Sequence, residues 1–274
     1  MTAATGLELI AEAFARVRAD GRRAALMPYL MGGFPTLPAS REIGLAYARG
    51  GADLVELGVP FSDPLADGPV IHAAATAALD AGATLPAVLE VGRAIAEHVP
   101  VVLMCYANPI FARGLERFVD GLVSAGISGL IVPDLPLEES GDALAACDAR
   151  GIALVPLVAP TTPVDRLASI GALARGFLYA VSVTGTTGER TAVDGGLEVL
   201  VRRAAAHTEV PVAVGFGIAT PEQAAAAAAA GADGVIIGSR LVRAAGDAPE
   251  PAAAVADLVG AFSAALSPPS RVAK

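Results

Sequence analysis

Three carboxylates lie close together in a stretch of sequence that is too rich in proline and glycine to form regular structure. The segment VELGVPFSDPLADGP, residues 55–69, contains Glu56, Asp63 and Asp67. Glu56 ends an apolar run, where burial of a charge is costly and the pKa of an acid is commonly raised into the range suited to proton transfer. Two carboxylates placed in this way could exchange protons with a substrate and stabilise positive charge that develops on it.

Each of these acids also has a purely structural interpretation. Glu56 could be a buried acid that is neutralised by backbone groups or by an arginine. Asp67 precedes a glycine, and Asp-Gly is common in turns. Asp63 precedes a proline and is better explained as a turn former. The residues alone therefore leave Glu56 and Asp67 as candidate catalytic carboxylates, with the structural alternative open for both.

The sequence predicts eight short strands that alternate with helices and that would bring these residues together. The strands are expected at residues 24–31, 53–57, 99–105, 128–133, 152–158, 176–182, 210–215 and 233–237. The helices are expected at residues 38–50, 84–98, 114–125, 138–149, 163–174, 194–207, 221–230, and 239–245 continuing at 250–266. Apolar strands alternating with helices indicate a parallel sheet that is covered on both faces.

Eight such units in about 240 residues fit a closed barrel better than an open sheet. We therefore expect an α/β fold, a single (β/α)8 TIM barrel over residues 1–266. An extra amphipathic helix is expected at the N-terminus, and a flexible tail over residues 267–274. In such a barrel the reactive groups gather at the C-terminal ends of the strands, which is where Glu56 and Asp67 fall.

Three glycine-bearing segments follow the last three expected strands and indicate a phosphate site. They are SVTGTTGE at 182–189, GFGIAT at 215–220 and IIGSR at 236–240. Glycine lets backbone N–H groups approach an anion, and a helix N-terminus adds partial positive charge. Ser239 could cap the helix that follows it and also bind a phosphate oxygen. We expect a phosphorylated substrate, and no nucleoside triphosphate because no Walker-type motif is present.

The composition argues against several other classes of chemistry. The chain has 19 Lys and Arg against 28 Asp and Glu, and this net charge of −9 argues against nucleic-acid binding. The only lysine is Lys274, the last residue, which excludes chemistry through an internal lysine Schiff base. His72, His98 and His207 are too scattered for a protein-built metal site, so no metal is expected.

The sequence also argues against secretion and membrane insertion. No apolar run reaches the ~20 residues that a membrane span needs. The first twenty residues lack both the basic and the uninterrupted apolar segments of a signal peptide. The two cysteines suggest no disulfide framework. We expect a cytoplasmic protein without membrane contact.

Taken together, these segments resemble the α subunit of tryptophan synthase. The resemblance covers about residues 6–262. It is carried by ELGVPFSDPLADGP (56–69), YANPIF (106–111), GLIVPDLPLEE (129–139), LVAPTT (157–162), GFLYAVS (176–182), VGFGI (214–218) and GADGVIIGS (231–239). The family is a (β/α)8 barrel that cleaves indole-3-glycerol phosphate into indole and glyceraldehyde 3-phosphate. The resemblance therefore implies a carbon–carbon lyase that needs no cofactor of its own.

The resemblance also implies a role for each candidate residue. Glu56 falls on the family's general acid/base, Asp67 on its second catalytic carboxylate, and Tyr179 on an active-site tyrosine. The implied phosphate-binding residues are Gly188, Gly217, Gly238 and Ser239, and the implied indole pocket is formed by Tyr29, Met104, Ile131 and Phe216.

A partner is implied in the same way. The family's β subunit holds pyridoxal phosphate and condenses indole with serine, and an αββα heterotetramer is expected. The loops at 60–67 and 183–197, together with Asn108, should form the surface that meets the β subunit. Both loops are rich in Gly, Pro or Thr, so we expect the isolated chain to be a weakly active monomer in which loop 183–197 is mobile.

Four positions depart from the family pattern. His72 stands where glutamine is usual, Ala77 where arginine is frequent, and Arg113 where tyrosine is usual. Thr186 replaces a usual valine in the loop that closes over the site.

Two alternatives remain from the residues themselves. The first is another phosphate-binding barrel, such as a sugar-phosphate isomerase or decarboxylase, because fold does not determine function. The second is a non-catalytic activating subunit that keeps the barrel only for its partner interface. An intact pair of Glu56 and Asp67 argues against the second.

Overall fold

The computed structural model describes residues 4–181, 196–215, 217–268 of the 274-residue chain. Its strands are β1 Ala25–Met31, β2 Val55–Gly58, β3 Val101–Met104, β4 Gly129–Ile131, β5 Ala153–Val155, β6 Leu157–Val158, β7 Leu178–Val181, β8 Val212–Gly215 and β9 Gly234–Ile237. Each of the eight expected strands is present. The fifth is divided into β5 and β6, because Pro156 lies between them and has no backbone N–H to donate.

The strands pair in parallel in the order β5-β4-β3-β2-β1-β9-β8-β7-β6. The two ends of this order, β5 and β6, are separated by one residue, so the sheet curves round until its ends meet. The carbonyl of Pro156 accepts a hydrogen bond from the backbone N–H of Tyr179 at 3.0 Å. The (β/α)8 barrel that the sequence predicts is therefore confirmed, with β5 and β6 as two halves of one strand.

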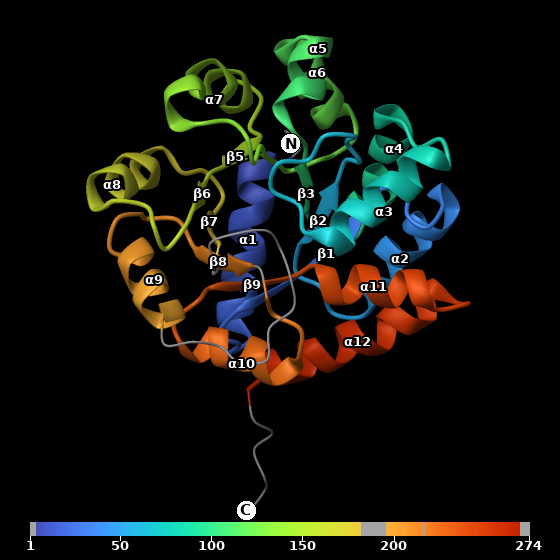
Figure 1. Ribbon diagram of the computed structural model, residues 1–274. Coiled ribbons are helices and arrows are strands. Elements are labelled where there is room, and N and C mark those ends of the chain that lie inside the picture. The colour runs from blue at the N-terminus through green and yellow to red at the C-terminus, as the bar shows by residue number, and fades with distance from the viewer. Residues whose placement is uncertain (1–3, 182–195, 216, 269–274) are drawn as a thin grey trace, which may run out of the picture.

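All helices except α1, which lies in the middle of the view, surround the strands as a ring in Figure 1. The helices are α1 Gly6–Ala19, α2 Leu37–Arg49, α3 Pro69–Asp80, α4 Leu85–Ala96, α5 Ala107–Arg113, α6 Leu115–Ser124, η1 Leu137–Glu139 (a 3₁₀ turn), α7 Gly141–Asp148, α8 Val164–Leu173, α9 Gly196–Ala205, α10 Pro221–Ala229, α11 Ser239–Asp247 and α12 Pro251–Leu266.

Two of these helices were not predicted. The alanine-rich α3 begins at Pro69, directly after the proline- and glycine-rich segment, and α5 contains Pro109. The helix ranges expected from the sequence include neither stretch. Proline at the first helical position is favourable because its missing N–H has no partner there in any case.

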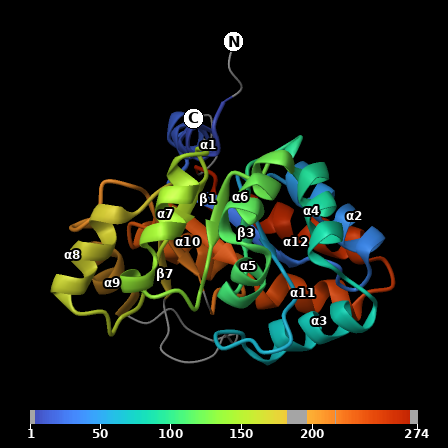
Figure 2. The same cartoon turned by 90° about the horizontal axis from the view of Figure 1, so that it is seen from above.

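The extra N-terminal helix that the sequence predicts is present as α1, and it covers one end of the barrel. Thr5 caps it in a capping box with Glu8. Its apolar face, which includes Ile10 and Phe14, is buried with the inward-facing side chains of the barrel. The ring of Phe14 lies 6.1 Å from that of Phe177, just before β7. Figure 2 shows α1 at one end and the segment between β2 and α3 at the other.

An ion pair is buried beside the start of β1. A guanidinium nitrogen of Arg22 lies 2.9 Å from a carboxylate oxygen of Asp53, and their side chains are only 12% and 7% exposed. Asp53 also accepts the backbone N–H of Leu26 at 2.8 Å. The pair thus joins the segments that precede β1 and β2.

In the part of the chain that the structure describes, no single helix is both long and apolar enough to cross a membrane, although the sharply bent pair α3 and α4 meets the test by length and composition. Of the tail expected after Leu266, residues 269–274 lie outside the described residues.

Candidate active site

Glu56 projects into the barrel from β2. Its neighbours Val55 and Leu57 pack outward against the helices, so alternation along the strand turns Glu56 inward. Its side chain is buried, and its Oε2 atom has no hydrogen-bond partner among the described residues. Burial, followed by the nearby charge of Asp67, raises the pKa of Glu56 to about 8. The acid is therefore largely protonated at neutral pH and is able to donate a proton.

Asp67 lies in the segment between β2 and α3, at the end of the barrel opposite α1 (Figure 2). Its Oδ1 atom accepts a hydrogen bond from the hydroxyl of Tyr106 at 3.0 Å. Burial raises the pKa of Asp67, while this hydrogen bond and the charge of His72 lower it. Asp63, which the sequence assigns to a turn, is exposed and accepts the hydroxyl of Ser62.

Two buried tyrosines lie within the electrostatic reach of these acids. Burial raises the pKa of Tyr29, and the charges of Asp67 and Glu56 raise it further. Burial likewise raises the pKa of Tyr179, and the charges of Glu56 and Tyr29 raise it further. The structure therefore brings these two tyrosines and two carboxylates to one place, although they come from β1, β2, β7 and a loop.

Glycines at the strand ends make room for both tyrosines. A Cβ atom at Gly58 would lie 2.0 Å from the hydroxyl oxygen of Tyr29. A Cβ atom at Gly215 would lie 2.3 Å from the hydroxyl oxygen of Tyr179. Both distances are impossible for a real side chain, so glycine is required for either tyrosine to occupy its position.

The apolar residues that the sequence analysis placed in an indole pocket face the same interior. Met104 on β3 pairs with Ile131 on β4, and both belong with Tyr29 to the cluster of inward-facing side chains. Phe216, the fourth predicted residue, lies outside the described residues. The three that are described therefore face the same interior, and Tyr29 lies opposite Glu56 in the sheet.

The predicted phosphate site is described in part. Gly217 has a φ of +83°, a conformation that glycine adopts without strain. Gly238 follows β9 and is the N-cap of α11, and Ser239 is the first residue of the helix. The prediction that Ser239 caps α11 is therefore wrong, because the chain turns one residue earlier. Gly188 lies outside the described residues.

The start of α11 can bind an anion because its first backbone N–H groups have no partner within the helix. Only from Leu241 onward do backbone N–H groups bond back to the helix start, at the carbonyl of Gly238. Among the described residues, a Cβ atom at Gly238 would meet only the Cβ of Tyr29, at 4.0 Å.

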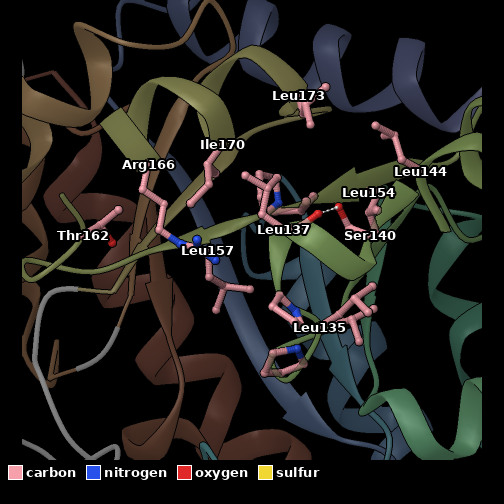
Figure 3. Close-up of a pocket in the computed structure, with 15 residues that line it drawn as sticks. Leu135, Leu137, Ser140, Leu144, Leu154, Leu157, Thr162, Arg166, Ile170 and Leu173 are labelled. Carbon is pink, nitrogen blue, oxygen red and sulfur yellow. Dashed lines mark hydrogen bonds between the residues drawn. The ribbon is translucent and has the colours of Figure 1, made fainter. Parts of the chain in front are cut away.

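A separate pocket of about 180 Å³ lies between η1, α7 and α8, over the break between β5 and β6 (Figure 3). Its lining is mostly apolar and includes Leu137, Leu144 and Leu173. Arg166 at its edge forms a two-pronged ion pair with Glu138. None of the predicted site residues in the described chain lines this pocket. The described residues also hold no group of three or more possible metal ligands.

The comparison with known families identifies the chain. The family model described as tryptophan synthase alpha chain matches residues 14–266. The chain belongs to the tryptophan synthase alpha chain family. The resemblance found in the sequence is thus confirmed, and the interior carboxylate of Glu56 lies in a barrel of the family's kind.

Relatives in the tryptophan synthase alpha chain family are similar over most of their length. The tryptophan synthase alpha chain of Prochlorococcus marinus is 50% identical over 239 residues, which are 85% of this chain and 86% of the relative. That of Methanosarcina mazei is 49% identical over 234 residues, 85% of each.

Solved structures of tryptophan synthase share the fold. A structure of Mycobacterium tuberculosis tryptophan synthase has a TM-score of 0.88 at 38% identity, and covers 94% of this chain and 98% of that one. A structure of the a2b2 tryptophan synthase complex of Pyrococcus furiosus has a TM-score of 0.82 at 35% identity, and covers 87% and 97%.

Tyr106 is a site residue that the sequence analysis did not assign. It stands in the YANPIF segment that carries the family resemblance, directly after β3, and this position was the available signal. Of the departures from the family pattern, His72 lies on α3 and acts on Asp67, Ala77 is exposed on α3, and Arg113 ends α5. Thr186 lies outside the described residues.

Proposed function

We propose that this chain acts as the α subunit of tryptophan synthase and cleaves indole-3-glycerol phosphate into indole and glyceraldehyde 3-phosphate. The observation that carries the proposal is Glu56, a buried acid inside the barrel with a raised pKa and an oxygen that has no partner in the described chain. An acid held in this state is poised to transfer a proton, and its neighbour Asp67 supplies a second carboxylate.

The cleavage requires the enzyme to donate one proton to the substrate and to accept another from it. Protonation of indole C3 removes the aromaticity of the five-membered ring and leaves positive charge near N1. Glu56, protonated at neutral pH, donates this proton. The resulting carboxylate then accepts the proton of the side-chain hydroxyl next to C3, so that the C–C bond breaks and its electron pair returns to the ring. Glu56 ends in its initial state, and no external acid or base is consumed.

Asp67 stabilises the charged intermediate. As a carboxylate it accepts the N1–H of the indole ring and lies close to the positive charge, and this attraction is strong in a site that excludes water. Tyr179 lies within the field of Glu56 and contacts the reacting part of the substrate. Tyr29, Met104, Ile131 and Phe216 enclose the ring.

The phosphate group anchors the other end of the substrate. Gly217, Gly238 and Ser239 bind it through backbone N–H groups and the serine hydroxyl at the start of α11, and Gly188 contributes from the segment outside the described residues. Because phosphate binding does not change during the reaction, it fixes the position of C3 relative to Glu56.

The partner of this chain is the β subunit of tryptophan synthase, in an αββα heterotetramer. The end of the barrel that carries Asp67 exposes apolar side chains that suit such an interface: Leu65 is 79% exposed and Phe111 on α5 is 50% exposed. We place pyridoxal phosphate on the β subunit and no cofactor on this chain, and we assign the pair to the cytoplasm.

The test is direct measurement of indole release. The purified chain is incubated with indole-3-glycerol phosphate, alone and with its β subunit, and indole and glyceraldehyde 3-phosphate are quantified in equal amounts. We expect slow release from the chain alone and faster release from the complex, because docking closes the loops around the site. A chain that binds the β subunit but releases no indole in either state would be a non-catalytic activating subunit. A chain that does neither would belong to another class of phosphate-binding barrel.

A further inference from the structure

Tyr106 joins three separate features of the site. Its aromatic ring stacks on Phe61 with 5.3 Å between ring centroids. Its hydroxyl oxygen accepts the backbone N–H of Ala66 at 3.1 Å and donates to Oδ1 of Asp67 at 3.0 Å. The segment between β2 and α3 is therefore attached at both of its ends to one side chain at the end of β3.

The position of Tyr106 is itself fixed. It is the N-cap of α5, and the next backbone N–H, that of Ala107, donates to the carboxylate of Asp134 at 2.9 Å. The side chain of Tyr106 is almost completely buried. A buried ring on a capped helix start has little freedom, so it is a rigid reference point for the loop that contacts it.

The direction of the two hydrogen bonds determines where the tyrosine proton points. A backbone N–H can only donate, so the tyrosine oxygen is the acceptor for Ala66. The single hydroxyl proton of Tyr106 is then free to be donated to Asp67. Oδ1 of Asp67 must accept it, and this arrangement favours the ionised carboxylate, which has only acceptors.

We propose that Tyr106 is a positioning residue whose hydroxyl holds Asp67 ionised, with Oδ1 occupied and Oδ2 left to accept the N1–H of the indole ring. This inference rests on the proposed function, since it concerns the same reaction. Tyr106 touches no reacting atom, and its effect reaches the substrate through Asp67.

Other charged and titratable groups also act around Asp67. Glu56 faces it from β2, Tyr29 from β1 and His72 from α3. Burial opposes ionisation of Asp67, whereas the hydrogen bond from Tyr106 and the charge of His72 favour it. His72 acts by charge alone in the described structure, while Tyr106 acts by a directed bond. Their removal should therefore have different consequences.

The test is Tyr106→Phe, which keeps the ring that stacks on Phe61 and removes only the hydroxyl. The pKa of Asp67 is measured by ¹³C NMR of the carboxyl carbon in the aspartate-labelled full chain, with Asp67→Asn for assignment. We expect that pKa to rise by about one to two units, as for loss of a hydrogen bond to a charged group. The acid limb of kcat for indole release should move to higher pH, and kcat should stay at least about tenfold lower on the plateau, while binding of glycerol 3-phosphate is unchanged.

Two further variants separate positioning from general damage. Tyr47→Phe removes another buried tyrosine hydroxyl, which donates to the backbone carbonyl of Tyr29 at 3.2 Å. It should lower stability without moving the Asp67 titration. His72→Gln should raise the pKa of Asp67 but leave kcat on the plateau unchanged, because the hydrogen bond from Tyr106 still holds Asp67 in place.

An Asp67 titration that is the same in Tyr106→Phe as in the unmodified chain would overturn the inference, as would a normal plateau kcat in that variant. Absence of indole release from the unmodified chain would instead overturn the proposed function. The NMR titration does not depend on turnover, so the two failures are distinguishable.

Discussion

Glu56 lies directly opposite Tyr29 in the parallel pairing of β1 and β2. Both side chains therefore face the barrel interior at the same level, and both are buried. If Glu56 transfers the protons of the reaction, Glu56→Gln keeps its shape and removes its chemistry. Indole release should fall by at least the ~10²–10⁴-fold typical of a lost general acid/base. Turnover assays of the complex, with the β reaction as a control for folding and assembly, would show this. Near-normal turnover would exclude Glu56 from proton transfer.

The raised pKa of Glu56 also makes stability depend on pH. The pKa is about 8 in the folded chain against a reference value of 4.5. The folded state thus binds more protons than the unfolded state between these values, and the free energy of unfolding falls as pH rises from about 4.5 to 8. Glu56→Gln should match the unmodified chain near pH 5 and be more stable by a few kcal/mol near pH 8.5. Urea unfolding at both pH values measures the difference. Glu12→Gln, an exposed change on α1, is the control, and an equal pH effect in both variants would contradict the prediction.

The start of α11 allows phosphate binding to be tested without disturbing the barrel. Within the described part of the chain a Cβ atom at Gly238 meets only Tyr29, at 4.0 Å, so we expect Gly238→Leu to fold. Its side chain should block access to the backbone N–H groups and weaken binding of glycerol 3-phosphate by at least about tenfold, while free indole binds as before. Ser239→Ala should weaken phosphate binding less, because it removes one hydrogen bond and leaves the backbone in place. Calorimetric titration with both ligands measures this. Equal losses for indole and glycerol 3-phosphate would indicate general damage instead.

The buried pair of Arg22 and Asp53 should support stability and not catalysis. Arg22→Ala leaves the carboxylate of Asp53 buried without its cation, which typically costs about 3–5 kcal/mol. The exposed pair of Arg41 and Glu42 offers a matched control, since Arg41→Ala should change stability by less than about 1 kcal/mol. Denaturant unfolding gives both values. Well below the unfolding temperature, Arg22→Ala should release indole at the normal rate, and a specific loss of kcat there would contradict a purely structural role.

Most of the barrel could be predicted from the sequence because its signals are local. A few neighbouring residues are enough to indicate each apolar strand, each glycine after a strand and the acid at the end of β2. A parallel sheet of eight repeated strand–helix units then has few possible topologies. For the same reason the sequence placed Glu56 and Gly238 at the C-terminal end of the barrel. Recognition of the family supplied what these signals could not, namely the substrate and the partner.

The missed features depend on contacts between distant segments. The helix ranges expected from the sequence contained neither α3 nor α5, because each follows the loop after a strand and has proline in its first turn. It predicted one strand over 152–158, whereas the missing N–H of Pro156 divides that strand where the barrel closes.

The sequence by itself determined that an acid ends β2 and that a second acid follows in a stiff loop. Only the tertiary structure decided that Tyr106, 39 residues from Asp67, donates its proton to that second acid. The same structure left an oxygen of Glu56 without a partner in the described chain. The reason is physical. Strand and turn preferences are set by neighbouring residues, whereas burial, charge and hydrogen bonding at a site arise from groups that only folding brings together.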